Sequence, residues 1–444
     1  GSIKVASFNV LNYFSTIDDG SNSCNLQRCR GADSADELDR QADKIVSALA
    51  AMDADVVGLI ELENNGDIAI GDLVSRLNTV VGAETYNFVS TGVTGTDAIT
   101  VGIIYQPGTV TPLGGPAVLD EQSFVDPLDT GSDKNRPAVA QTFISTDGAL
   151  TVVVNHFKSK GSNCGGGPDD DPIQGNCNGT RTAAAQALTA WLATDPTGTE
   201  AALGTFNTDI LMVGDFNSYA GEDPMDALKA GASGITFADL NGGPGTNQYS
   251  YLFDGQIGYL DTALASQSLQ VTGSGVWHIN ADEVPVFDYN DTVWDPSEAS
   301  FNTKPDGNEL YEANAFRSSD HDPVITGMYL NYAPVCTSAF PSVGTLRPVN
   351  HKMVEVSVLG ATDANDEPLT YSIDSIFQDE PVDADDDGAT YPDGVITGST
   401  VQLRAERNGE GNGRVYHVSF SVADGSGSGC SGVVKVLVPL KKRK

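Results

Sequence analysis

Short apolar runs of strand length recur along the first three quarters of this chain, and polar side chains stand at their ends. Continuous apolar runs are typical of strands buried on both faces, as in the core of a layered sheet structure. The polar residues at these ends are Asn9, Glu61, His156, Asp215, Asn217, Asp320 and His321. We therefore expect sheets whose edge collects carboxylate, amide and imidazole groups from distant segments.

These chemical groups suit a site that holds a divalent metal beside a phosphate. Carboxylate and amide oxygens are the hard ligands that Mg²⁺ prefers. One polar strand end would mean little, because a solvated turn is the usual reason for it. The run Gly-Asp-Phe-Asn at 214–217, for example, contains residue types that favour turns. The recurrence over separate segments favours a hydrolase.

The remaining pattern predicts a mixed α/β region. Ser34 and Glu37 have the spacing of a capping box, which predicts a helix over 34–52, and a second helix is predicted over 182–193. Strands are predicted at 56–62, 99–105, 138–144, 151–155, 210–213, 257–264 and 323–329.

Eight stretches resemble the endonuclease/exonuclease/phosphatase family, and specifically its secreted bacterial branch of extracellular DNA nucleases. They are VASFNVLNYF (5–14), GLIELENN (58–65), NRP (135–137), NHFKSKG (155–161), GDFN (214–217), YSYLFDGQ (249–256), GYLD (258–261) and SDHDP (319–323). They follow the family order over residues 3–330. The resemblance implies a DNase I-like α/β fold, in which two β-sheets form a sandwich flanked by helices.

The same resemblance implies a divalent-metal site. Glu61 would be the principal ligand of Mg²⁺ or Mn²⁺, and Asn9 and Asp320 would complete a set of oxygen donors. Asp215 would orient or deprotonate the attacking water, and Asn217 would hold the phosphate or align Asp215.

Two histidines would act on the phosphate. His321 would pair with the carboxylate of Asp261, and His156 would be a second imidazole that gives general acid or electrostatic help at the leaving oxygen. The resemblance does not divide these roles between the two rings. Arg136, Arg181 and Lys158 are the candidate substrate contacts, although a solvated or salt-bridged cation is the usual case.

The chain has 24 basic and 60 acidic residues and a formal net charge of −36. Such a field repels nucleic acid, so the cations that matter must be local. Basic residues within or beside the family motifs are Lys134, Arg136, Lys158, Lys160, Arg181, Lys304 and Arg317. Most of the acidity is explained by the solubility of a secreted protein.

The length of 444 residues suggests two domains, and the composition changes after 331. We expect a catalytic domain over 1–331 and a small all-β sandwich over 332–444, where short alternating runs resemble cadherin-like, immunoglobulin-type modules. Asp383, Asp385 and Asp387 stand at calcium-loop positions, but Gly394 replaces the closing glutamate. A partial Ca²⁺ loop and an acidic turn are both compatible with this run.

The six cysteines fall into sequence-close or domain-confined pairs with no zinc-ligand spacing. We expect disulfides between Cys24 and Cys29, Cys164 and Cys177, and Cys336 and Cys430. Disulfides imply an oxidising compartment, so the protein is expected to be secreted or attached to a bacterial cell surface. The loop between Cys164 and Cys177 could border the substrate groove or be a stiffened surface excursion.

The sequence thus favours a monomeric, metal-dependent phosphodiesterase that acts on DNA, with action on RNA left open. A sphingomyelinase-type enzyme is the alternative on the same fold, and a surface adhesin with a decayed hydrolase domain is the alternative from another class. No exposed apolar hairpin for membrane contact is expected, which disfavours the lipid enzyme and membrane insertion. The intact motif residues disfavour decay.

Overall fold

The computed structural model describes residues 2–19, 24, 29–242, 248–295, 300–304, 310–382, 388, 390–409, 411–425 and 427–440. The chain divides into two compact units, Gly1–Ser145 with Ala149–Leu330, and Thr146–Gly148 with Asn331–Lys444. Within the described ranges, no helix is long and apolar enough to cross a bilayer. The acidic positions Asp383, Asp385 and Asp387 lie outside the described residues.

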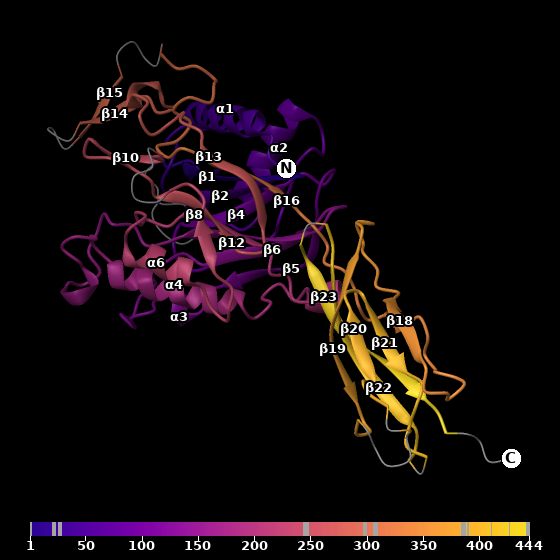
Figure 1. Cartoon of the computed structure of the whole chain (residues 1–444). Coiled ribbons are helices and arrows are strands. Elements are labelled where there is room, and N and C mark those ends of the chain that lie inside the picture. Colours follow the sequence, from indigo (N-terminus) through magenta and orange to yellow (C-terminus); the bar gives the residue numbers. More distant parts are fainter. Residues whose placement is uncertain are drawn as a thin grey trace. The chain divides into compact units, whose positions relative to one another are not determined.

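The first unit contains two six-stranded sheets, which lie between helices (Figure 1). The first sheet has the order β13 (Gln270–Val276), β16 (Val324–Tyr329), β1 (Ile3–Tyr13), β2 (Val56–Glu63), β4 (Ile99–Tyr105) and β3 (Asn87–Phe88). The second has the order β5 (Thr111–Leu119), β6 (Ala138–Ile144), β7 (Ala149–His156), β8 (Ile210–Asp215), β12 (Asp261–Ser266) and β9 (Phe237–Asp239).

Apolar side chains fill three layers of this unit. Val56 and Ile60 of the first sheet meet Val152 and Val213 of the second in the core between the sheets. The helices α1 (Ala35–Met52) and α2 (Ile68–Val81) cover the outer face of the first sheet, and α3 (Gln122–Val125), α4 (Asn178–Leu192) and α6 (Asp223–Ala230) cover that of the second. The predicted two-sheet sandwich flanked by helices is therefore confirmed.

Local signals set most element boundaries. The helix α1 begins after Ser34, whose Oγ accepts a hydrogen bond of 3.3 Å from the backbone N–H of Glu37. The Glu37 carboxylate accepts from the N–H of Asp33 instead of Ser34, so the capping box is not reciprocal. The predicted helix over 182–193 begins earlier, at Asn178.

The strand predicted over 257–264 is divided in the structure. Its first part pairs in a short hairpin of β10 (Tyr251–Phe253) and β11 (Gln256–Gly258), and its second part is β12. A single apolar pattern hid the break because Tyr259 and Leu260, which join the two strands, are themselves buried.

The second unit is all-β, as predicted. One sheet has the order β17 (Phe340–Pro341), β18 (Met353–Leu359), β21 (Thr400–Arg404) and β20 (Gly394–Thr397), and the other has β19 (Thr370–Gln378), β22 (Arg414–Ala423) and β23 (Gly429–Val438). Both sheets contribute to one apolar core that includes Val401, Tyr416 and Val436.

All three predicted disulfides are present. Their Cα–Cα distances are 5.2 Å for Cys24–Cys29, 5.2 Å for Cys164–Cys177 and 5.8 Å for Cys336–Cys430. These distances are ordinary for a disulfide. The structure is therefore compatible with an oxidising, extracellular environment.

Candidate active site

Three strand ends of the second sheet place His156, Asp215 and Asp261 in one row. In the parallel pair of β7 and β8, His156 lies opposite Asp215, and in the antiparallel pair of β12 and β8, Asp261 lies opposite the same residue. Directly paired residues on neighbouring strands project from the same face of a sheet. The three buried side chains therefore form a continuous polar row at the edge of an apolar sheet.

A glycine and a left-handed residue shape the turn around Asp215. A Cβ atom on Gly214 would lie 2.1 Å from the carbonyl oxygen of Asn155, and its φ of +135° is a conformation that side chains disfavour. Asn217 has a φ of +48°, and its N–H donates a 2.8 Å hydrogen bond to Oδ1 of Asp215. The turn chemistry of this motif thus fixes the orientation of the carboxylate.

In the first sheet, irregular pairing brings Glu61 to the same region. The register of β1 against β2 shifts between Asn9 and Tyr13, and Glu61 has a φ of +68°. Its carboxylate accepts hydrogen bonds from Nδ2 of Asn9 at 3.2 Å and from the N–H of Asn12 at 3.1 Å. A β-bulge of this kind redirects a side chain. Here the Glu61 side chain departs from the alternation of faces along β2 and lies against Asn9 and Asn12.

His156 connects the two sheets. Its Nε2 lies 3.7 Å from Oδ2 of Asp215 and 4.0 Å from Oε1 of Glu61. The Nη1 of Arg136 lies 3.3 Å from the same nitrogen, and Nδ1 is buried without a hydrogen-bond partner among the described residues. Burial, followed by the charge of Arg136, holds the pKa of His156 well below its usual range. The ring is therefore neutral at pH 7.

His321 is the second histidine of the site and has the opposite charge state. Its Nδ1 lies 2.6 Å from Oδ2 of Asp261. Burial alone would lower the pKa of His321, but the carboxylates of Asp261 and Asp320 outweigh it and hold the pKa well above the usual range. The ring of Tyr251 stacks on the imidazole with centroids 4.4 Å apart. His321 is thus a positioned imidazolium.

The carboxylates of the site repel one another. Burial, then the charge of Asp261, raises the pKa of Asp215 to about 8. Burial, then the charge of Asp320, also raises the pKa of Glu61. Oδ1 of Asp261 is buried and has no hydrogen-bond partner among the described residues. Carboxylates that repel one another, one of them with an unpartnered buried oxygen, form a donor set that fits a divalent cation.

Among the described residues, two clusters bring three possible metal ligands within 4.8 Å of one another: Asp215, Asp261 and His321 in this site, and Asp33, Glu37 and Asp291 away from it. The Nδ1 of His321 is already bonded to Asp261, and a protonated imidazole cannot ligate a metal. The hydrogen-bonded pair of Asn9 and Glu61, with Asp320 near it, is chemically better suited to hold the cation.

Two of the predicted substrate contacts lie beside the row. Arg136 is held by Asp97, with its Nη2 2.8 Å from Oδ2, and only 12% of its side chain is exposed. The Nζ of Lys158 donates to Oγ of Ser162 at 2.9 Å. Their positive charges both act on His156, so a phosphate at the row would meet a local cationic surface.

Arg181 differs from the prediction because its side chain is fully buried. Its Nη1 donates to the carbonyl oxygens of Lys158 at 3.0 Å and Asn176 at 2.8 Å, and its Nε donates to Oγ of Ser218. A side chain engaged in this way holds the loop before α4, and its Nη2 is buried with no partner among the described residues. The position of Arg181 beside the family motifs led to the prediction of a substrate contact. In the structure, the loop before α4 surrounds its guanidinium through the carbonyl oxygens of Lys158 and Asn176. Of the other cations, Lys304 is paired with Asp288.

Sequence reasoning assigned no role to Ser250, although it lies within the family stretch 249–256. Its Oγ donates to Oδ2 of Asp261 at 2.9 Å and accepts from the N–H groups of Leu260 and Asp261, both at 3.0 Å. Its carbonyl oxygen accepts from the N–H of Asp322 at 2.8 Å. Ser250 therefore links the strand of Asp261 to the loop of His321.

Asn280 is a second residue that the sequence did not single out. Its Nδ2 donates to the carbonyl oxygen of His321 at 2.7 Å, and its Oδ1 accepts from the N–H of Ser318 at 2.8 Å. This amide holds the two ends of the loop that carries His321. An asparagine in a loop gives no sequence signal for such a contact.

The expectation that there is no exposed apolar hairpin was wrong. In the hairpin of β10 and β11, the exposed fractions are 39% for Leu252, 63% for Phe253 and 62% for Ile257. Apolar side chains in a strand are usually buried. Among the strands that the structure describes, β10 and β11 pair with each other and with no third strand, so these side chains are left uncovered. The lipid alternative can no longer be disfavoured on this ground.

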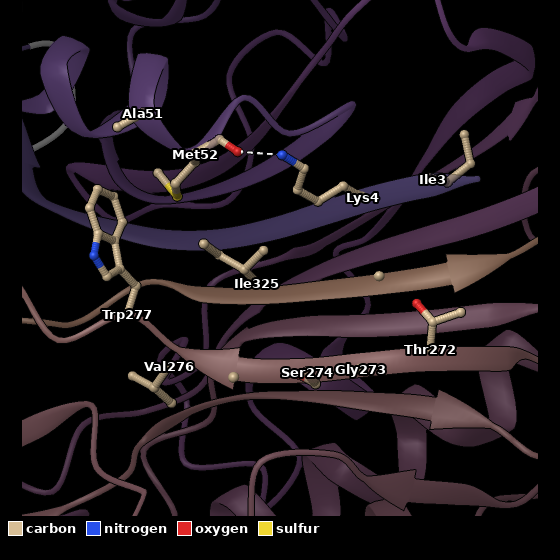
Figure 2. Close-up of a pocket in the computed structure, with 12 residues that line it drawn as sticks. Ile3, Lys4, Ala51, Met52, Thr272, Gly273, Ser274, Val276, Trp277 and Ile325 are labelled. Carbon is tan, nitrogen blue, oxygen red and sulfur yellow. Dashed lines mark hydrogen bonds between the residues drawn. The ribbon is translucent and has the colours of Figure 1, made fainter. Parts of the chain in front are cut away.

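A groove of about 720 Å³ lies elsewhere on the first unit, along β13, β16 and the end of α1. Figure 2 shows Trp277 and Met52 on one side of it, and the Nζ of Lys4 donating to the carbonyl oxygen of Met52. None of the polar residues described above lines this groove. Its wall is chiefly apolar and glycine-rich, so it offers no hydrolytic chemistry.

The sequence profile described as the endonuclease/exonuclease/phosphatase family matches residues 6–321. No curated protein matches the chain. Among solved structures, an endonuclease/exonuclease/phosphatase family protein from Bacteroides thetaiotaomicron is 14% identical, with 74% of this chain and 98% of that chain covered and a TM-score of 0.44.

A mannosyl-6-phosphatase from the same organism is 15% identical, with 74% of this chain and 100% of that chain covered and a TM-score of 0.43. ANGEL2, described as a 2′,3′-cyclic phosphatase, is 16% identical, with 74% of this chain and 95% of that chain covered and a TM-score of 0.46. Identities this low say nothing about a shared substrate.

Proposed function

The chain belongs to the endonuclease/exonuclease/phosphatase family, and on this premise we propose that it is a secreted, divalent-metal-dependent nuclease that hydrolyses phosphodiester bonds of extracellular DNA. One observation carries the proposal. A continuous set of contacts joins Glu61 through His156 to Asp215 across the two sheets, and Asp261 beside it is bonded to His321.

Asn9, Glu61 and Asp320 would hold Mg²⁺ or Mn²⁺. The bound cation supplies positive charge to the phosphate oxygens, which stabilises the charge of the transition state. The acidic site favours such a cation because burial and then the charge of Asp320 raise the pKa of Glu61, and a cation between the two carboxylates would offset that repulsion.

Asp215 is the group that we assign to the attacking water. With a pKa of about 8, Asp215 is a stronger base than an exposed carboxylate once it is ionised, so its role as a base requires the ionised form. The N–H of Asn217 holds one oxygen of Asp215, which leaves the other oxygen to orient the water. A proton taken from the water would then reside on this carboxyl group.

The two histidines stabilise negative charge on the phosphate in different ways. His321, kept protonated by Asp261, donates an N–H hydrogen bond to a phosphoryl oxygen. His156, which is neutral and lies beside Arg136, is placed to assist the leaving oxygen.

DNA is the proposed substrate because of the stretches NHFKSKG and YSYLFDGQ, which resemble the secreted nuclease branch, and because Arg136 and Lys158 supply local positive charge. A sphingomyelinase-type activity is the second candidate. The exposed Leu252, Phe253 and Ile257 favour it, since an apolar surface beside an active site can contact lipid.

The remaining assignments rest on composition and on the disulfides. The disulfide-bonded cysteines support secretion or attachment to a cell surface. We propose that the catalytic domain comprises residues 1–331 and that the second unit is a cadherin-like or immunoglobulin-type attachment module. We also propose that the protein acts as a monomer. Ca²⁺ binding by the acidic run at 383–387 is a further part of this proposal.

The test compares two substrates with and without chelation. Purified protein should cut plasmid DNA when Mg²⁺ or Mn²⁺ is added and should stop in excess EDTA, while sphingomyelin vesicles should remain intact. His321→Ala protein serves as the control for contaminating nucleases. Cleavage that persists in EDTA would exclude the metal, and hydrolysis of sphingomyelin without cleavage of DNA would replace the proposed function with the lipid alternative.

A further inference from the structure

The hairpin of β10 and β11 leads directly out from the catalytic histidine. Tyr251, the first residue of β10, stacks on His321, with ring centroids 4.4 Å apart and an interplanar angle of 29°. Phe253 follows two residues later on the same strand, so its side chain projects from the same face as Tyr251. Tyr251 is half-buried, whereas 63% of Phe253 is exposed.

We propose that Phe253 is a stacking platform for the nucleobase that flanks the phosphate held at His321. This inference rests on the proposed nuclease function and names the part of the substrate that this edge of the site recognises. Residues i and i+2 of a strand lie roughly 7 Å apart. Phe253 is therefore the next side chain on this face of β10 after Tyr251, farther from His321 and more exposed to solvent.

The surroundings of Tyr251 supply the other parts of a surface for single nucleotides. Gly258 lies opposite Tyr251, and a Cβ at Gly258 would lie 2.5 Å from the ring of Tyr219, so glycine lets that ring approach. The Nζ of Lys160 lies 4.7 Å from the centroid of the Tyr219 ring and is paired with the carboxylate of Glu222. Aromatic rings are the platforms on which proteins stack unpaired bases without regard to base identity.

The tip of the hairpin argues against a lipid or a phosphate as its partner. Asp254 and Gly255 have φ values of +49° and +74°, as in a tight two-residue hairpin turn. The turn places a carboxylate at the end of the hairpin, where insertion into a bilayer would bury a charge. The same carboxylate repels a phosphate, whereas an uncharged base can stack on the adjacent ring.

The pairing of the hairpin provides a matched control. Leu252 pairs with Ile257, and Phe253 pairs with Gln256, so Ile257 projects from the face opposite Phe253. Ile257 is 62% exposed, which is close to the 63% of Phe253. A membrane contact would use the apolar side chains of both faces, but base stacking would use Phe253 alone.

The experiment uses the full chain and two oligonucleotides that each contain one hydrolysable phosphodiester among resistant linkages. In one oligonucleotide both sugars at that linkage carry bases, and in the other both are abasic. We expect Phe253→Ala to lower kcat/KM about tenfold on the first and less than about twofold on the second. Phe253→Trp should retain the parent rate, and Ile257→Ala should match the parent on both.

Near-ultraviolet dichroism checks that each variant is folded, and flotation with sphingomyelin vesicles measures lipid binding. Equal losses on the two oligonucleotides, or no loss on either, would overturn the stacking role while the nuclease function stands. Vesicle binding that both Phe253→Ala and Ile257→Ala abolish would overturn it in favour of a membrane contact. A parent protein that cuts neither oligonucleotide but is active on sphingomyelin would overturn the proposed function itself.

Discussion

The hydroxyl group of Ser250 donates a 2.9 Å hydrogen bond to Oδ2 of Asp261, the oxygen that also lies 2.6 Å from Nδ1 of His321. The same hydroxyl accepts from two buried N–H groups. We expect Ser250→Ala to lower kcat/KM at least tenfold, about 1.4 kcal/mol, because Asp261 loses the bond that orients it. Initial rates on plasmid DNA measure the loss.

Ser250→Thr is the control, because threonine keeps the hydroxyl group. It should restore most of the rate if the hydrogen bond is what matters. Ser250→Ala should also destabilise the fold by roughly 1–3 kcal/mol, since it leaves buried donors unsatisfied. If both variants are folded and equally slow, the role of Ser250 is packing and not the orientation of Asp261.

Replacement of Glu61 by Gln should raise the concentration of Mg²⁺ needed for half-maximal activity and slow turnover by at least about tenfold, or 1.4 kcal/mol. Glutamine keeps the size of the side chain but removes the charge that holds a hard cation. Glu63→Gln is the matched control, because Glu63 lies on the same strand and bonds to Ser15 and Thr16. Titration of Mg²⁺ with both variants is the measurement. An unchanged metal requirement in Glu61→Gln would remove it from the metal site.

His321→Ala should lose most activity and retain the melting temperature of the parent within a few degrees. The expected loss is about 10²–10⁴-fold, the usual contribution of a positioned acid or donor. His278→Ala is the control: its Nδ1 is also bonded to an aspartate, Asp322, at 3.0 Å, but the ring is exposed and stacks on Tyr249. Similar losses in the two variants would show that the loop 319–323, and not the imidazole of His321, limits the rate.

The strand-end residues could be predicted from the sequence because their signal is local. Asn9, Glu61, His156 and Asp215 each interrupt or end an apolar run, and a buried polar group at such a place calls for a partner. The pairing of β7, β8 and β12 then brings the side chains of His156, Asp215 and Asp261 into one row.

The contacts of Ser250, Asn280 and Arg181 could not be predicted, because each depends on a segment distant in sequence. Serine in a polar stretch has the same local appearance whether it is solvated or bonded to Asp261, and only tertiary approach decides. The helix α2 was also missed, although Asp67, a residue type that favours the N-cap, stands before it. It has no acidic residue in its first turn, and the Asp67 side chain makes no cap hydrogen bond.

Lys44 predicts a pH dependence of stability. Its ammonium group is buried on α1 and donates to the carbonyl oxygen of Phe316 at 2.9 Å, and burial lowers its pKa from 10.5 to about 8. Between these values the unfolded chain binds more protons than the folded one, so this group makes stability rise with pH from about 8 to about 10.5 and adds no slope below about 8. Lys44→Met should remove roughly 3 kcal/mol of this rise.

Denaturant unfolding of the parent and of Lys44→Met at pH 7, 9 and 10.5 gives the difference directly, because other titrating groups are common to both proteins. Lys229→Met, which changes an exposed lysine of α6, is the control. If the free energy of unfolding changes with pH by the same amount in the parent and in Lys44→Met, the buried ammonium does not lose its proton in this pH range.

A chain that ends at 331 should retain catalysis on soluble DNA. Every residue placed in the site, from Asn9 to Asp322, precedes this point, and the two sheets that carry them lie in the first unit. Expression of 1–331 without the second unit, a check of folding by near-ultraviolet dichroism and initial rates at saturating Mg²⁺ make the test. We expect a rate within about threefold of the full chain, which is less than about 1 kcal/mol of transition-state stabilisation. Attachment to cell surfaces should be lost instead, and added Ca²⁺ should stabilise only the full chain. A folded truncation with less than about a tenth of the full rate would mean that residues after 331 help to build the catalytic site.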